Sequence, residues 1–110
     1  MPYIVIFMKY PSHVADKVRQ KSLEGQEKNL FPHDTHLQDT VVQSAGKFSE
    51  DGIRLLSVTL AKEGKLREAL MSIGKEMSYM SEVEGFESSI EVWATLPEQY
   101  EILGTEPPSE

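Results

Sequence analysis

The chain has 110 residues, of which 39% are hydrophobic and 26% are charged, with a formal net charge of −7 and no cysteine. This length is typical of a single domain with one core, and no apolar run approaches the roughly 18 residues of a membrane-spanning helix. The lack of cysteine excludes disulfides and thiolate metal sites. Lys75 is the last basic residue, so the second half is strongly acidic, which argues against a nucleic-acid partner. We therefore expect a cytoplasmic protein that binds neither nucleic acid nor membrane.

The first elements predicted along the chain are a strand and a helix. Residues 3–10, YIVIFMKY, are apolar at both alternating sets of positions, which is typical of a strand buried on both faces. Ser12 then favours a helix start and Gly25 a possible helix end. Residues 26–40 show neither helical nor strand periodicity and contain Pro32, so we expect a long connection there.

A β-hairpin is predicted next, although its first arm is ambiguous. Residues 53–61, IRLLSVTLA, indicate a strand, and the Asp51-Gly52 pair before them favours a hairpin turn. Residues 40–49, TVVQSAGKFS, are compatible with the partner strand or with a short helix that ends at Gly52.

The most regular pattern lies between residues 65 and 96. Six apolar residues recur with helical spacing on one stripe, which predicts an amphipathic helix: Leu66, Ala69, Leu70, Ile73, Met77 and Met80. Gly74, at the edge of this stripe, is interpreted as a point where the helix approaches the sheet closely. A strand over 87–95 follows the turn at Gly85, and its alternation places Trp93 on the face away from the helix.

The chain is expected to end in a short helix and a tail. Pro97 fits the first position of a helix and Gly104 fits its end. We expect one domain over residues 1–104 and a disordered acidic tail over 105–110.

The predicted order, βαββαβ, indicates an α+β fold of the ferredoxin-like type, with both helices on one face of a four-stranded antiparallel sheet. Residues 52–70, with the pattern GIxxLxVxxxxEGKLxEAL, and residues 84–93, with EGFxxxIEVW, resemble small uncharacterised members of the dimeric α+β barrel superfamily. That resemblance implies a homodimer, or a higher assembly of dimers, whose sheets face one another around a cavity. It does not select a function, because the superfamily includes enzymes and binding modules.

Few residues are candidates for chemistry. His33, Asp34 and His36 are weak candidates for a metal site, since imidazole and carboxylate bind divalent transition metals, but their spacing matches no strong motif and we expect no cofactor. His13 and Tyr10 are the candidate catalytic groups at a cavity mouth. Tyr3 and Trp93 are candidates for a ligand-binding wall, or for packing in the dimer core.

Two functions remain open at this stage. The first is a small oligomeric module that binds a small molecule or serves as an assembly component. The alternative is a cofactor-independent enzyme of the monooxygenase or isomerase kind, acting on a small organic substrate through His13 and Tyr10.

Overall fold

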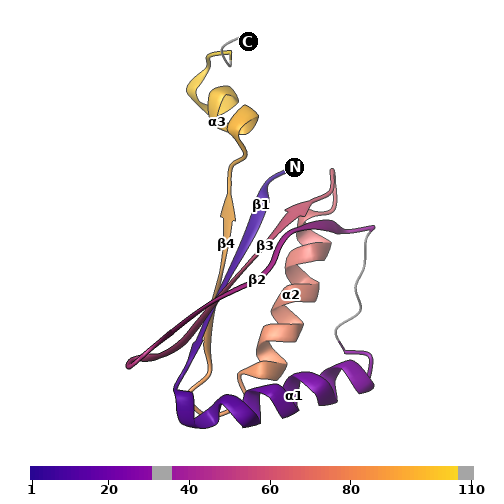
Figure 1. Cartoon of the computed structure of the whole chain (residues 1–110). Helices are drawn as coiled ribbons and strands as arrows, with labels where there is room; N and C mark the ends of the chain where they lie inside the picture. The colour runs from indigo at the N-terminus through magenta and orange to yellow at the C-terminus, as the bar shows by residue number, and fades with distance from the viewer. Residues whose placement is uncertain (31–35, 107–110) are drawn as a thin grey trace.

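The computed structural model describes residues 1–30 and 36–106, and its centre is one four-stranded antiparallel sheet in the order β2-β3-β1-β4 (Figure 1). The strand β1 pairs with β3 on one side and with β4 on the other, so the apolar first strand lies in the middle of the sheet. The strands are β1 (Tyr3–Tyr10), β2 (Gln38–Ser49), β3 (Gly52–Ala61) and β4 (Glu87–Trp93).

A 3-10 turn, η1 (Ser12–Val14), leads into α1 (Ala15–Glu27), and α2 (Leu66–Met80) connects β3 to β4. The helix α2 runs along one face of this sheet, and α1 lies across the lower end of α2 (Figure 1). The core between helices and sheet contains these buried residues: Ile4, Ile6, Val14, Val18, Ala61, Ala69, Ile73, Met77, Met80, Val83 and Phe86. The predicted element order and the predicted stripe of α2 are therefore confirmed. No helix in the described residues is long and apolar enough to cross a membrane.

The ambiguous segment 40–49 is a strand. It belongs to β2, which pairs with β3 across the turn of Glu50 and Asp51, and the alternative of a short helix is wrong. The pairing register shifts twice between Thr40 and Ala45. Such irregularities interrupt the alternation of faces, which explains why the sequence pattern was ambiguous there.

The first helix is longer than expected and begins differently. The side chain of Ser12 makes no cap hydrogen bond, and the α-helical turns begin at Ala15. Gly25 does not end the helix, which continues to Glu27, and Gly25 is buried within it. The left-handed residue after this helix is Asn29, with φ 56°, so asparagine rather than glycine provides the turn.

The close approach predicted at Gly74, within α2, occurs instead at Gly85, in the turn between α2 and β4. A Cβ atom on Gly74 would have no heavy atom within 4 Å, so this residue does not mark a close approach of helix to sheet. Close approach occurs instead at Gly85, whose φ is +89° and where a Cβ would lie 2.9 Å from Cδ of Pro11. The turn into β4 thus packs directly on the segment that follows β1.

The last helix, α3 (Leu96–Leu103), extends beyond the end of the sheet (Figure 1). Thr95 and Glu98 form a reciprocal capping box, a proline lies in the first turn, and Gly104 is left-handed with φ 72°. The predicted end at Gly104 is confirmed, whereas the helix begins at Leu96, one residue before the predicted first position, Pro97. The predicted tail, residues 105–110, follows Gly104 directly. Only its first two residues, Thr105 and Glu106, belong to the described part of the chain.

Candidate functional site

The face of the sheet opposite α1 and α2, which we call the open face, has no cover among the described residues. Its side chains follow from strand alternation and from the register of the pairs. The middle of the face is apolar, with Val42, Val5, Phe7, Leu56, Val58 and Leu60 on three strands. Val5 is only 4% exposed because its neighbours on this face surround it.

One end of the open face carries a row of charges that crosses the sheet. The register places Lys47, Arg54, Lys9 and Glu87 side by side on the four strands. Nζ of Lys9 forms an ion pair with Oε2 of Glu87 at 3.0 Å, whereas Lys47 and Arg54 have no ion pair within the described part of the chain. We call the three cations Lys47, Arg54 and Lys9 the cationic end.

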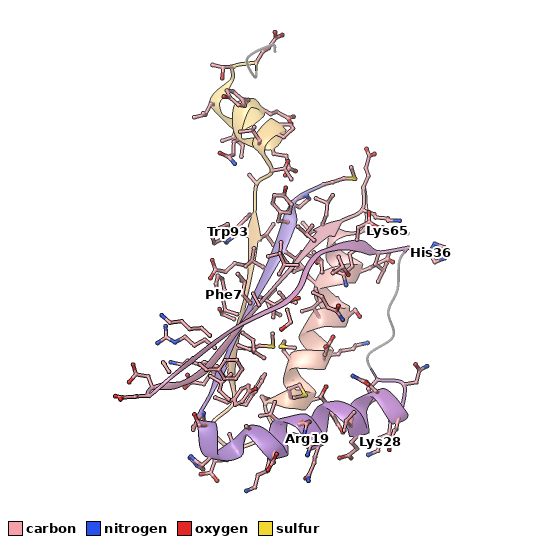
Figure 2. The ribbon with its side chains drawn as sticks, in the orientation of Figure 1. Phe7, Arg19, Lys28, His36, Lys65 and Trp93 are labelled. Atoms are coloured by element: carbon pink, nitrogen blue, oxygen red, sulfur yellow. The ribbon has the colours of Figure 1, made fainter. Side chains whose placement is uncertain are left out.

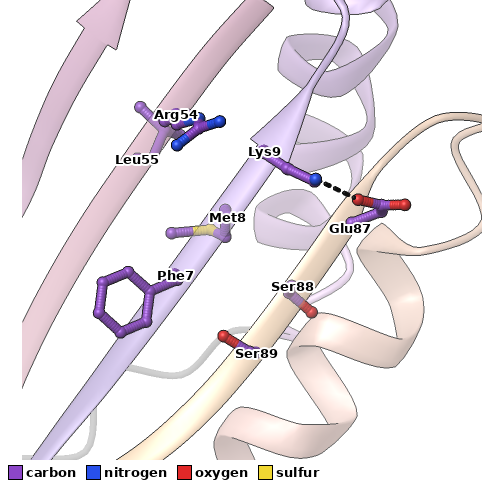
Figure 3. Close-up of a pocket in the computed structure, with 8 residues that line it drawn as sticks. All are labelled: Phe7, Met8, Lys9, Arg54, Leu55, Glu87, Ser88 and Ser89. Carbon is purple, nitrogen blue, oxygen red and sulfur yellow. Dashed lines mark ion pairs between the residues drawn. The ribbon is translucent and has the colours of Figure 1, made fainter.

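A shallow depression of about 350 Å³ lies at this end (Figure 3). From the open face it is lined by a phenyl ring, two cations, a carboxylate and a hydroxyl: Phe7, Lys9, Arg54, Glu87 and Ser89. Met8, Leu55 and Ser88 alternate with these residues along the strands and complete the lining. The combination of an aromatic surface with an unpaired guanidinium suits a small organic molecule that carries a negative charge.

The predicted ligand candidates Tyr3 and Trp93 lie at the opposite end of the open face. They are directly paired across β1 and β4, and the indole is 52% exposed. Figure 2 shows Phe7 and Trp93 on the side of the sheet away from α2. The indole N–H of Trp93 donates a hydrogen bond of 2.9 Å to Oε1 of Glu91, which fixes the ring above the edge strand.

The structure does not bring the catalytic candidates to this face. The ring of Tyr10 stacks on Phe86 with centroids 6.1 Å apart, on the side of the helices, and burial raises the pKa of its hydroxyl. His13 is an exposed residue of η1. Tyr10 and Tyr3 are at opposite ends of β1, about 23 Å apart at the usual rise of a strand. Neither Tyr10 nor His13 lines the depression.

The metal candidates are only partly within the described residues. His33 and Asp34 lie outside them, and His36 is an exposed residue just before β2. Among residues 1–30 and 36–106 no group of three or more His, Cys, Asp or Glu side chains is arranged to hold a metal ion.

The charged row was not predicted from the sequence. Its members are isolated charges within four separate strands, and they become neighbours only through the register of those strands. The available signal was the outward position of Lys9 on an otherwise apolar strand, which marks where the apolar face stops.

No protein-family model, no curated protein and no solved structure matches this chain.

Proposed function

We propose that the chain is a self-associating subunit of the ferredoxin-like class, in which two copies pack open face to open face in the cytoplasm. The observation that carries this proposal is the apolar centre of the open face. A four-stranded sheet with helices on one side normally exposes polar residues on the other. Here one strand after another presents Val, Leu and Phe to a face that nothing in the described chain covers.

Several features support a copy of the same chain as the cover. The βαββαβ order and the strand order β2-β3-β1-β4 suit a face-to-face pair of identical sheets, as in dimeric α+β barrels. Apolar surface of this kind is worth about 25 cal/mol per Å² when it leaves water. A two-fold pair buries the same surface on both copies, so one patch of sequence provides both sides of the interface.

The test is a substitution in the middle of the open face. Leu56→Lys would place an ammonium in the interface, and we expect monomers by size-exclusion chromatography with light scattering, with unchanged far-UV circular dichroism. Met71→Lys is the matched control, because Met71 lies on the outer surface of α2 and is 56% exposed. If Leu56→Lys unfolds the chain, the milder Trp93→Ala variant serves the same purpose. Dimers of unaltered affinity in a folded open-face variant would overturn the proposal.

A second candidate function, binding of a small organic anion, is supported by the depression at the cationic end. Of the two cations that line the depression, Arg54 has no ion pair in the described chain, and it is the diagonal neighbour of Phe7 on the adjacent strand. An aromatic carboxylate would pair with the guanidinium and place its ring on the phenyl group. Benzoate and its hydroxylated derivatives are suitable probes, with Arg54→Gln as the variant expected to lose binding and Lys17→Gln as a surface control. Equal binding by both variants would exclude this site.

A further inference from the structure

The helix α3 is fully formed, yet no other part of the described chain buries it. Leu96, Tyr100 and Leu103 recur at i, i+4 and i+7 and form an apolar stripe, yet none of the residues of α3 is buried. Leu96 is 60% exposed and Leu103 is 72% exposed. An ion pair of 3.2 Å between the amino group of Met1 and Oε2 of Glu98 joins it to the body of the chain.

Eight residues are too few for a stable helix in water. Helices shorter than about 12 residues depend on tertiary packing of their apolar side. The radius of gyration, 16.0 Å, also exceeds the value of about 13 Å expected for a folded chain of about 100 residues, which reflects how far α3 stands from the sheet. The described residues offer α3 no such packing surface.

We propose that α3 is an exchanged arm, which packs across the cationic end of the partner copy's open face. This inference rests on the sheet-to-sheet dimer proposed above. The stripe Leu96, Tyr100 and Leu103 packs over the cationic end itself, next to the row of Leu56 and Phe7 that the partner's sheet covers. The arm thereby closes the open side of the depression, so each site is completed by the partner.

Charge favours one of the two relative orientations that the facing sheets could adopt. A two-fold axis along the strands would place the two cationic ends together, with Lys47, Arg54 and Lys9 of both copies in one patch. An axis across the strands places the cationic end of each copy against the Trp93 end of the other. The arm that leaves this end is acidic, with Glu101 and Glu106 exposed and without an ion pair among the described residues. Opposite charges then meet and like charges are kept apart.

The test is paramagnetic relaxation in mixed dimers. Because the chain has no cysteine, a spin label attached to Thr105→Cys, just beyond α3, is the only thiol adduct. The spin-labelled copy, which carries no ¹⁵N, is mixed with the unaltered ¹⁵N-enriched copy until mixed dimers form. Any broadening of the amide signals then comes from the label on the partner copy. We expect the amide signals of Lys9, Arg54 and Glu87 to broaden, and those of Asp39 and Leu60 at the other end of the face to stay sharp. The label on Lys17→Cys of α1 is the control and should leave the open face unaffected.

The mass of the same sample is measured in parallel, to distinguish a monomer from a dimer. Broadening at the cationic end supports the exchanged arm. A dimer with broadening confined to Asp39 and Leu60, or with none on the open face, overturns the arm but leaves the sheet-to-sheet dimer standing. A folded monomer overturns the proposed function itself. An independent check is Leu103→Glu, which we expect to weaken association at least tenfold while Glu63→Gln has no effect.

Discussion

The indole ring of Trp93 lies 6.4 Å from the phenyl ring of Phe7, measured between centroids, with the two planes tilted by 47°. Both rings belong to the open face. Trp93 lies on the edge strand β4, and Phe7 lines the depression at the cationic end. A tilted pair at this distance is an attractive arrangement of aromatic rings. The pair thus forms a continuous aromatic surface that a partner copy covers.

The first prediction concerns the environment of Trp93, which is the single tryptophan of the chain. In the isolated subunit Trp93 is 52% exposed, whereas a facing sheet would remove its ring from water. We expect blue-shifted emission that acrylamide quenches poorly, and a shift to the red on dilution. Trp93→Ala should weaken association by at least tenfold, about 1.4 kcal/mol, with little change in circular dichroism. Emission that is red-shifted and independent of concentration would show that the ring is never covered.

The second prediction concerns Gly85. A side chain there meets two obstacles, a φ of +89° and a contact of 2.9 Å between the new Cβ and Pro11. Gly85→Ala is expected to lower the free energy of unfolding by about 1 to 3 kcal/mol, measured by urea denaturation. Gly64→Ala is the matched control, because Gly64 has a similar φ of +74° but nothing within 4 Å. Equal losses for the two variants would show that only the backbone conformation matters at Gly85.

The third prediction concerns Gly74, in the interior of α2. With open space around its Cβ position, alanine meets no obstacle and improves helix propensity. Gly74→Ala should raise the free energy of unfolding by about 0.5 to 1 kcal/mol. A loss of stability in the same measurement would mean that the helix surface is covered at this point.

The sequence predicted those features that depend on local periodicity. The apolar stripe of α2 and the alternation of β4 each depend on the sequence of one segment. The predicted faces of both elements are correct, and so is the position of Trp93 on the face away from α2. The interpretation of Gly74 was wrong because a glycine on a helix does not reveal whether its surroundings are filled. The row from Lys47 to Glu87 could not be predicted, because it depends on the register between four strands and on the two register shifts in β2. Long-range pairing of this kind is not encoded in any single segment.

The fourth prediction concerns Glu76 of α2, whose pKa is raised above its ordinary value of 4.5 by burial. The folded chain therefore favours the protonated carboxyl, and this contribution to stability is full below about pH 4.5 and is lost as pH rises through the raised pKa. Glu76→Gln should be more stable than the unaltered chain at pH 7, and the difference should vanish below pH 4.5. The exposed Glu63→Gln is the control for the change in net charge. If the difference in the free energy of unfolding between Glu76→Gln and the unaltered chain were the same at pH 7 and below pH 4.5, the Glu76 carboxylate would not be destabilised by burial.

Sedimentation equilibrium of the unaltered chain tests the central claim most directly, because the open face determines both the proposed function and the placement of α3. At micromolar concentration we expect a mass of twice the 12.4 kDa of the chain, or a multiple of it, with a folded circular dichroism spectrum. A folded species of 12.4 kDa that persists at that concentration would contradict the account.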